Sequence, residues 1–507
     1  MLQPQVFKAN DIRGVVGAEW DAQGAAALGA AFVSAFGLAG KEFVLGRDMR
    51  TSGVGLSAAF AQSAIRSGAS PVDISLASTD EVWYASGALG LPGVQFTASH
   101  NPCDYNGVKF CLPGAAPITP ELMAAIREQA LNGRPLPDAP TPGRMTSRDI
   151  LPDYAAYLHR LVDCSDVHGL KIVVDAGNGM AGHTTAAVLG PLDVEVIGLY
   201  LDLDGSFPNH PPNPLDPANL VDARRAVVEH GADIGLVFDG DADRCFIIDE
   251  HGEVVNPSAI TALVARDVLA REPGAAIVVN SITSKAVADV VAAAGGRLVV
   301  SPVGHTHIKA HMAAEHAVFG GEHSAHYYFR EFWGADTGMV AALTVLAMVG
   351  RTGLSVSQLV ADLPSYSSSG EINTHVSDPK AVMKDVADTF CYGGGDGSNG
   401  LVGRESSSWS QGPFEPSPDI NSGTVRLAHE TDATVEENKA RGTVPTPTSP
   451  PKITWSDGLR IDGPGWWVSV RESNTEPLLR LNVEAADEPT MAALRDRALA
   501  IIRKEPA

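Results

Sequence analysis

The sequence predicts three similar mixed α/β domains in series, followed by a smaller α+β domain at the C-terminal end. Segments 43–50 (FVLGRDMR), 171–182 (KIVVDAGNGMAG) and 276–284 (AIVVNSITS) share one pattern. Each is an apolar, β-branched run that ends in Gly, Asp, Ser or Thr and is followed by an Ala-rich stretch. A strand, a turn and a helix in this order form the unit of a parallel α/β sheet.

The length and composition also indicate several domains. The chain has 507 residues, of which 44% are hydrophobic and 19% charged, as in globular proteins. Domains usually contain roughly 100 to 200 residues. Candidate boundaries are the proline-rich segment 135–142, the Asn256-Pro257 pair and the serine run at 366–370. We therefore predict domains at 1–145, 146–255, 256–368 and 369–507.

The last domain has a different pattern. It predicts a strand at 371–376, a helix at 381–390, strands at 459–461, 466–470 and 478–483, and a helix at 491–502. Residues 392–451 are rich in Gly, Ser and Pro and have little to bury, so we expect a flexible insertion there.

The net charge and the cysteine content limit the kinds of partner and cellular compartment that we expect. The formal net charge of −23 disfavours binding to nucleic acid or to anionic membranes, which requires clustered Lys and Arg. Five cysteines without a C-x-x-C pair indicate reduced thiols. The longest apolar stretch, 339–350, is shorter than the roughly 20 residues of a membrane span. We expect a cytoplasmic protein.

Residues 234–249 (IGLVFDGDADRCFIID) carry the strongest chemical signal. Asp239, Asp241 and Asp243 lie between two apolar runs, and carboxylates this close repel one another unless a cation lies between them. Oxygen ligands without histidine favour Mg²⁺ or Ca²⁺ over zinc. An EF-hand is disfavoured because Arg244 replaces its invariant glycine. A solvated acidic turn is the simpler alternative, which the apolar flanks disfavour.

Residues 96–110 (FTASHNPCDYNGVKF) place Ser99 beside His100, in a turn favoured by Asn101-Pro102. Ser99 is a candidate nucleophile or phosphoryl carrier, because a metal ion opposite a serine oxygen suits phosphoryl transfer. Adjacent side chains of an extended chain point apart, so the sequence alone does not position His100 as a base. A plain turn is the alternative.

Two further segments suit a phosphorylated sugar. In residues 320–324 (GGEHS), Glu322 and Ser324 offer a carboxylate and a hydroxyl for sugar hydroxyl groups. Residues 471–475 (RESNT) combine a guanidinium, two hydroxyls and turn amides, which suit a phosphate, although a simple turn is the alternative.

Two other site classes compete. His307 and His311 have the spacing of helical zinc ligands, but no third ligand is evident. Residues 177–182 (GNGMAG), with Asp202 after the next predicted strand, match a dinucleotide-binding fingerprint. An NAD-dependent oxidoreductase leaves the loops at Ser99, Asp239 and Arg471 unexplained.

Together, four motifs resemble those of the α-D-phosphohexomutases, in particular the phosphomannomutase/phosphoglucomutase branch. They are a serine loop at 97–102 (TASHNP), a metal loop at 239–244 (DGDADR), a sugar loop at 321–324 (GEHS) and a phosphate loop at 471–477 (RESNTEP). They occur in the order of the family. The resemblance implies four domains around a central cleft, and an isomerase that moves phosphate between C1 and C6 of mannose or glucose.

The resemblance also implies a role for each matching residue. The implied catalytic residues are Ser99 as the phosphoserine, His100 and Lys109 in proton transfer, and Arg244 on the reacting phosphate. The implied Mg²⁺ ligands are Ser99, Asp239, Asp241 and Asp243. The implied substrate contacts are Arg13, His305, Glu322, Ser324, Arg471, Ser473, Asn474 and Thr475.

In the implied mechanism, phospho-Ser99 gives its group to a hexose phosphate, and a hexose 1,6-bisphosphate is both intermediate and activator. Phosphoglucosamine mutase is the nearest alternative, but that branch usually has Gln where this chain has His323. A non-catalytic phosphosugar-binding protein is disfavoured by the intact Ser99 and aspartates. The chain departs from the family at Asn10, where Tyr is common, and in the insertion.

Overall fold

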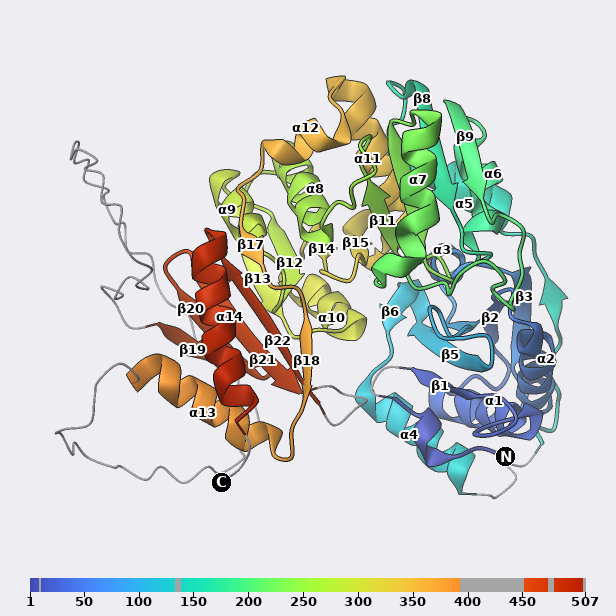
Figure 1. Ribbon diagram of the computed structural model, residues 1–507. Coiled ribbons are helices and arrows are strands. Elements are labelled where there is room, and N and C mark those ends of the chain that lie inside the picture. The colour runs from blue at the N-terminus through green and yellow to red at the C-terminus, as the bar shows by residue number, and fades with distance from the viewer. Residues whose placement is uncertain (9–10, 133–137, 393–450, 473–477, 505–507) are drawn as a thin grey trace, which may run out of the picture.

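The computed structural model describes residues 1–8, 11–132, 138–392, 451–472 and 478–504. These residues form four sheets that follow one another along the chain, with helices packed between them (Figure 1). The fold class is as predicted: three α/β units and a smaller α+β unit. Asn10 and almost all of the predicted insertion lie outside the described residues.

The first sheet is mixed and carries the serine loop. Its strands are β1 (Ile12–Val15), β2 (Glu42–Arg47), β3 (Ser70–Leu76), β4 (Gly93–Phe96), β5 (Tyr105–Leu112), β6 (Ala116–Pro117) and β7 (Thr146–Ser147). The helices of this part are α1 (Ala22–Phe36), α2 (Thr51–Arg66), α3 (Thr79–Leu89) and α4 (Pro120–Leu131). β2 pairs in parallel with β3 and β4, whereas β5 is antiparallel to β1 and β4.

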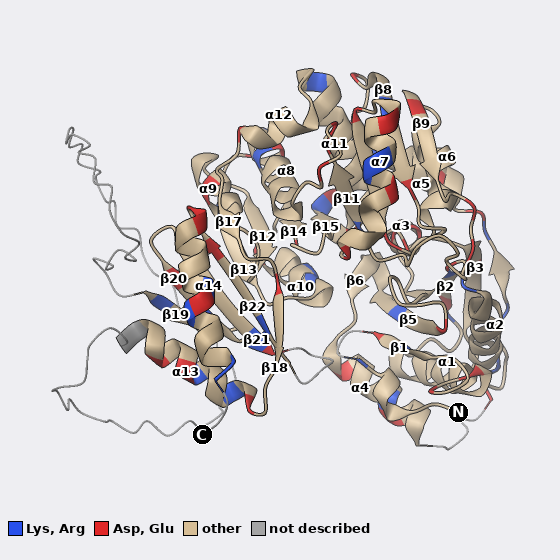
Figure 2. Ribbon diagram, viewed as in Figure 1, with Lys and Arg blue, Asp and Glu red and all other residues tan. Residues whose placement is uncertain are grey.

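The second sheet carries the metal loop. Its strands are β8 (His168–Asp175), β9 (Asp193–Leu199), β10 (Ile234–Phe238) and β11 (Cys245–Ile248), and its helices are α5 (Leu151–Leu161), α6 (Ala181–Leu189) and α7 (Val221–His230). β10 and β11 form an antiparallel hairpin in which Phe238 lies opposite Cys245. Because strands flank the acidic loop, it is not an EF-hand. Acidic and basic residues alternate along α7 (Figure 2), where Arg225 pairs with Asp222 and Glu229.

The third sheet carries the sugar loop. Its strands are β12 (Ala276–Asn280), β13 (Arg297–Ser301), β14 (Phe319–Gly321), β15 (Tyr327–Phe329) and β16 (Ala335–Asp336). The helices here are α8 (Pro257–Arg271), α9 (Lys285–Ala293), α10 (His305–Glu315), α11 (Gly338–Thr352) and α12 (Val356–Ala361). In the described part of the chain, no helix has both the length and the apolar character needed to cross a bilayer.

The fourth sheet is antiparallel. Its strands are β17 (Ser367–Ser368), β18 (Ile372–His375), β19 (Lys452–Thr454), β20 (Leu459–Gly463), β21 (Trp466–Glu472) and β22 (Leu478–Ala485), with helices α13 (Pro379–Tyr392) and α14 (Glu488–Ile502). The strands and helices predicted for this region are confirmed to within a few residues.

The three predicted strand–turn–helix units are confirmed at β2–α2, β8–α6 and β12–α9, whose strands pair in parallel with a neighbour. Each of the first three sheets also contains a hairpin. β4–β5, β10–β11 and β14–β15 are antiparallel pairs in which the first strand also pairs in parallel with a neighbour. A tight turn replaces the helical crossover at these places. The turns are the serine, metal and sugar loops, so the three units present equivalent hairpins to one another.

One hydrophobic core joins parts of the first three units, a second lies within the first unit, and the fourth unit has its own. Tyr84 of α3, Tyr157 of α5 and Trp333 pack as an aromatic cluster where the first three units meet. Because residues of all three units pack in this core, the sheets do not show to which domain each helix belongs. The predicted domain boundaries stay predictions.

The buried carboxylate of Asp80 also joins these three units. It accepts hydrogen bonds from Ser78 Oγ (2.5 Å), from Tyr154 OH on α5 (2.7 Å) and from Thr337 Oγ1 at the start of α11 (2.7 Å). Burial raises the pKa of Asp80 to about 7, although these hydroxyl groups oppose the shift. The junction therefore holds a carboxyl group that titrates near neutrality.

We expect Asp80→Asn to change the pH dependence of stability. The folded pKa lies above the unfolded value, so from about pH 4 to pH 7 the unfolded chain binds fewer protons than the folded protein. The unfolding free energy of the wild type therefore falls across this window relative to that of the variant. Unfolding temperatures measured from pH 5 to pH 8 should show this difference, whereas Asp153→Asn on the exposed side of α5 should follow the wild type.

Candidate active site

The serine loop between β4 and β5 places Ser99 against the metal loop of the second unit. Ser99 is 3% exposed and has a positive φ of 49°. Its Oγ donates a hydrogen bond to Asp239 Oδ2 at 2.6 Å and accepts one from Arg244 Nη2 at 3.1 Å. A non-glycine residue in the left-handed region is strained, and such strain persists only where the surroundings hold it.

The metal loop buries three carboxylates together. Asp239, Asp241 and Asp243 are at most 1% exposed, and oxygen atoms of all three lie within 4.8 Å of one another. Lys109 of β5 donates to Asp241 Oδ2 at 2.7 Å and to Asp243 Oδ2 at 2.6 Å. Arg244 donates to Asp239 Oδ2 through Nε (3.0 Å) and Nη2 (2.7 Å). Cations from two units thus oppose the repulsion.

Neighbouring charges outweigh burial at Lys109 and Asp243 but not at Asp239. Burial disfavours the ammonium form of Lys109, but Asp241 and Asp243 outweigh burial and raise its pKa. Burial likewise disfavours the ionised form of Asp243, but Lys109 and His326 outweigh it and hold its pKa well below the usual range. For Asp239 burial dominates over Arg244, and the pKa is raised.

The aspartate cluster fits a divalent cation. Asp241 Oδ1 and Asp243 Oδ1 are buried and have no hydrogen-bond partner in the described structure. Buried carboxylate oxygens are costly without a partner, and hard oxygen ligands suit Mg²⁺ or Ca²⁺. Ser99 Oγ, in contact with Asp239, is a further oxygen within reach of the cluster.

His100 contacts the same centre. Its Nδ1 lies 3.3 Å from Ser99 Oγ and also contacts Arg244 Nη2. Burial, followed by the charge of Arg244, lowers the pKa of His100 well below its usual value. A guanidinium has only donors, so His100 Nδ1 accepts from Arg244 and carries no proton in this arrangement. His100 therefore lies close to Ser99 Oγ, which the sequence alone did not establish.

The sugar loop touches the metal loop through His326. His326 Nε2 lies 3.5 Å from Asp243 Oδ1, and Arg244 and His326 form an isolated antiparallel bridge. Ser324 Oγ lies 2.9 Å from His326 Nδ1. Glu322 Oε1 accepts from Tyr328 OH at 2.5 Å, and its Oε2 accepts from Asn280 Nδ2 at 3.1 Å. Glu322 and Ser324 therefore lie beside the cluster.

His305 and Arg13 lie at the edge of this region. His305 begins α10, and burial lowers its pKa to about 4, with Lys309 and Lys109 adding to the effect. Arg13 of β1 donates to Asn101 Oδ1 of the serine loop at 2.8 Å and to Asp11 at 2.6 Å. The structure thus gathers the residues predicted in the first three units.

The predicted phosphate loop is set apart. Arg471, at the end of β21, is 8% exposed and pairs with Glu371 at 3.0 Å, as does Arg480 opposite it on β22. Within the described residues, Arg471 makes no hydrogen bond or ion pair with the serine or metal loop. Basic residues mark these strands in Figure 2. Ser473, Asn474 and Thr475 lie outside the described residues.

The two competing motifs have structural explanations. A Cβ on Gly182 would lie 2.0 Å from the carbonyl oxygen of Leu201, and one on Gly179 would lie 2.7 Å from that of Gly240. These glycines allow close packing, including packing behind the metal loop. Within the described residues, neither His307 nor His311 belongs to a group of three side chains able to hold a metal ion.

Sequence reasoning missed two residues that touch the metal loop. Thr79, at the start of α3, donates to Asp241 Oδ2 at 2.6 Å from its hydroxyl, and to the carbonyl of Asp241 at 2.9 Å from its backbone. The S-x-x-E pattern at 78–81 signals a helix start but not this distant contact. His326 is one of six histidines between residues 305 and 326, but nothing in the sequence indicates that Asp243 is its partner.

Comparison with known proteins identifies the family of this chain. Models described as phosphoglucomutase/phosphomannomutase alpha/beta/alpha domains I, II and III match residues 4–135, 152–252 and 256–366, and the model of the C-terminal domain matches residues 425–501. The chain belongs to this family. It is a phosphohexomutase, an isomerase of carbohydrate metabolism.

Relatives of the phosphohexomutase span its whole length. A phosphomannomutase of Salmonella montevideo is 35% identical over 497 residues, covering 96% of each chain. A phosphoglucomutase/phosphomannomutase family protein of Burkholderia thailandensis, solved by X-ray crystallography, is 27% identical with a TM-score of 0.81, covering 100% of this chain and 99% of that one. An N-acetylphosphoglucosamine mutase of Aspergillus fumigatus, solved with GlcNAc-6P and magnesium, shares the fold (14% identity, TM-score 0.54, coverage 84% and 93%).

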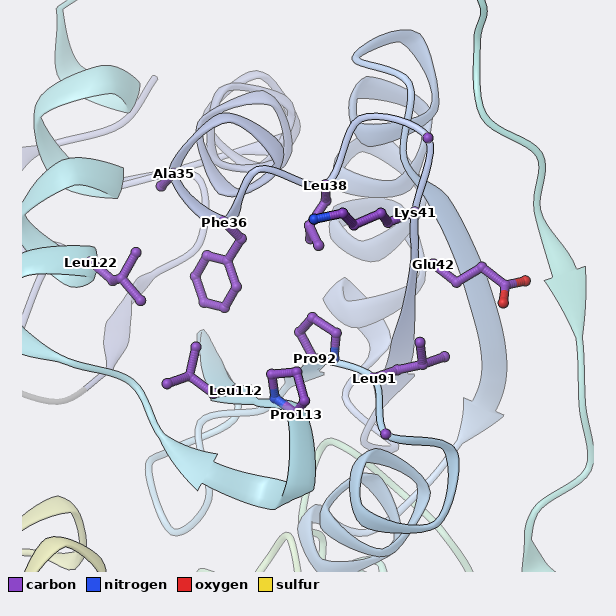
Figure 3. Close-up of a pocket in the computed structure, with 12 residues that line it drawn as sticks. Ala35, Phe36, Leu38, Lys41, Glu42, Leu91, Pro92, Leu112, Pro113 and Leu122 are labelled. Atoms are coloured by element: carbon purple, nitrogen blue, oxygen red, sulfur yellow. The ribbon is translucent and has the colours of Figure 1, made fainter.

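A separate pocket of about 690 Å³ lies on the first unit of the phosphohexomutase, where β2 begins (Figure 3). Phe36, Leu112 and Leu122 line an apolar hollow, and the carboxylate of Glu42 points away from it. No predicted site residue lines this pocket. The polar centre at Ser99, rather than this hollow, is the candidate active site.

We expect Asp241→Asn to weaken binding of a divalent cation. The substitution removes one charge from the cluster, so MgCl₂ should raise the unfolding temperature of the wild type by several degrees and that of the variant much less. Asp249→Asn, in the same hairpin but outside the cluster, is the control and should respond like the wild type. Equal shifts for Asp241→Asn and the wild type would contradict the assignment.

Proposed function

We propose that this phosphohexomutase interconverts hexose 6-phosphate and hexose 1-phosphate, with mannose and glucose as the sugars, through phospho-Ser99 and a hexose 1,6-bisphosphate. The observation that carries the proposal is the setting of the Ser99 hydroxyl, which lies 2.6 Å from Asp239 and 3.1 Å from Arg244 beside two further buried aspartates. Phosphoryl transfer depends on placing positive charge around the transferred group.

We assign the metal site to Ser99, Asp239, Asp241 and Asp243, with Mg²⁺ as the ion. When bound, Mg²⁺ supplies positive charge that offsets the charge of the phosphoryl group. Arg244 would bind phosphate oxygens and orient the group, because its guanidinium already contacts Ser99 Oγ. The magnesium named for the Aspergillus relative agrees with this choice.

The transfer itself breaks one P–O bond and makes another. A hydroxyl oxygen of the sugar attacks phosphorus, the bond from phosphorus to Ser99 Oγ breaks, and the attacking hydroxyl loses its proton while Ser99 Oγ becomes a hydroxyl. His100 and Lys109 are the proposed proton carriers, supported by the 3.3 Å separation of His100 Nδ1 from Ser99 Oγ and by the place of Lys109 on the metal loop. Return of the second phosphate to Ser99 runs the same step in reverse.

The sugar and the second phosphate need separate contacts. Glu322, Ser324 and His305 are proposed to bind the sugar, since their polar groups lie on or next to the loop that meets Asp243. Arg471 is proposed to hold the phosphate that does not react, together with Ser473, Asn474 and Thr475. Arg471 Nε is buried without a hydrogen-bond partner in the described residues, so a donor is available.

A free hexose 1,6-bisphosphate is the proposed activator, because it can phosphorylate an unphosphorylated Ser99. A further solved relative, an Aspergillus fumigatus mutase of the same fold (14% identity, TM-score 0.52), contains glucose 1,6-bisphosphate. His323, which contacts Ser258 Oγ at 3.2 Å, favours mannose and glucose over glucosamine phosphates on the family pattern. A cytoplasmic location is proposed from the free thiols of Cys103, Cys111, Cys164 and Cys245.

Phosphorylation at Ser99 tests the mechanism. After incubation with glucose 1,6-bisphosphate and Mg²⁺, the intact mass should increase by one phosphoryl group, and peptide mapping should place it on Ser99. Ser99→Ala should gain no mass and lose activity by orders of magnitude, since the carrier is absent. Ser206→Ala, at an exposed serine of the second unit, should behave like the wild type.

No phosphorylation of folded, Mg²⁺-loaded wild type at Ser99 would refute the phosphoenzyme mechanism. In that case the alternative of a non-catalytic phosphosugar-binding protein gains weight.

Arg471→Met tests the distant phosphate site. Loss of a contact made equally in the ground and transition states raises KM with little change in kcat, and a charge-assisted contact of about 2 kcal/mol corresponds to roughly a 30-fold rise. Steady-state kinetics with mannose 1-phosphate, glucose 1-phosphate and glucosamine 1-phosphate measures this. Arg460→Met, on the neighbouring strand, is the control. A fall in kcat without a change in KM would contradict the assignment.

A further inference from the structure

Arg50 lies directly behind the serine loop and binds its main chain. It is 1% exposed, at the turn between β2 and α2. Its Nη2 donates to the carbonyl oxygens of Ser99 (2.9 Å) and Asn101 (2.6 Å), and its Nη1 donates to those of Pro102 (2.6 Å) and Tyr105 (3.0 Å). The four carbonyls span the entire turn from Ser99 to the start of β5.

Every donor of this side chain is used. A guanidinium has five N–H groups, of which four serve the loop, and the fifth, on Nε, donates to Asp48 Oδ2 at 3.2 Å. Lysine has three donors at one point and cannot reproduce this fork. The contact set is therefore specific for arginine, and a buried charge of this kind requires such complete pairing.

Thr97 holds the other side of Ser99. Its Oγ1 accepts the backbone N–H of Ser99 at 2.9 Å. Asp48, the partner of Arg50 Nε, is fully buried and also accepts the backbone N–H of Arg50 at 3.0 Å. Thr97 and Arg50 thus contact the N–H and the C=O of Ser99, the residue whose φ is 49°.

The second unit closes over this arrangement. The guanidinium of Arg50 lies 5.0 Å from the centre of the Phe207 ring, and a Cβ on Gly205 would meet Cα of Arg50 at 2.6 Å. A Cβ on Gly240 of the metal loop would meet the carbonyl oxygen of Ser99 at 2.4 Å. The Ser99 carbonyl is therefore held between Arg50 and the metal loop.

We propose that Arg50 is a positioning residue for phosphoryl transfer, which holds Ser99 in its left-handed conformation so that Oγ meets Asp239 and Arg244. This inference rests on the proposed role of Ser99. Arg50 itself touches neither substrate nor metal, and acts only through the main chain of the serine loop. Its removal leaves the phosphosugar contacts in place and misplaces the oxygen that carries the phosphoryl group.

Steady-state and single-turnover kinetics of Arg50→Lys test this. A misplacement of about 1 Å at the reacting atoms costs on the order of 100-fold in rate, so kcat should fall by about 10- to 100-fold while KM stays within about threefold. The Mg²⁺ concentration for half-maximal activity should rise, because Ser99 is a proposed ligand. Replacement of a residue that only supports folding would lower the unfolding temperature, without a selective fall in kcat at unchanged KM.

Arg47→Lys is the matched control, because Arg47 ends β2 three residues before Arg50, is partly exposed and makes none of these contacts with the serine loop. It should keep kcat, KM and the Mg²⁺ dependence of the wild type. Phe207→Leu keeps an apolar side chain but removes the aromatic face, and should lower kcat about threefold with KM unchanged. This variant decides the matter if Arg50→Lys does not fold.

The proposal is overturned if folded Arg50→Lys keeps kcat within about threefold of the wild type, or if its loss lies in KM alone. It is equally overturned if Arg50→Lys does not fold and Phe207→Leu matches the wild type. Phosphosite mapping separates these results from failure of the proposed function. A wild type that carries phospho-Ser99 leaves the mechanism intact whatever Arg50 does, whereas a wild type without it refutes the mechanism and this inference together.

Discussion

Three carboxylates buried within one hairpin turn are the constraint on which the active centre depends. Asp239, Asp241 and Asp243 repel one another in a region of low dielectric constant, and the second unit supplies only Arg244 against them. Lys109 comes from the first unit and His326 from the third. The metal loop is therefore electrostatically incomplete until its neighbours are in place, and a divalent cation would complete the same balance.

Hydrophobic packing is divided between the units. One core joins parts of the first three units, whereas the β4–β5 hairpin packs largely into a second core that lies within the first unit. The fourth unit keeps a separate core and meets the third largely through polar groups: Ser281 Oγ and the Val303 N–H both donate to Asp457. Such polar contacts between domains usually permit relative motion. The units joined by a core thus carry the proposed chemistry, and the separate unit carries the proposed binding of the distant phosphate.

Local patterns were enough to predict the four-unit architecture and the loops at Ser99, Asp239 and Glu322, because each loop ends an apolar run that must be buried. The antiparallel pairing of the hairpins that carry these loops could not be predicted, since a buried strand has the same composition in either pairing. Contacts between units could not be predicted. Thr79 reaches Asp241 across 162 residues of sequence, and Arg50 binds carbonyl groups, which leave no trace in side-chain composition.

The pairing of Lys109 with Asp243 spans 134 residues, and the cation comes first in the chain. A ribosome adds roughly 5 to 20 residues per second, so the lysine is available about 7 to 27 seconds before the last carboxylate emerges. At that point the chain already contains Lys109 and all three aspartates of the metal loop, whereas His326 of the third unit has not yet been synthesised. The order of the units along the gene therefore lets the nascent protein neutralise its most repulsive segment as that segment folds, instead of waiting for the complete chain.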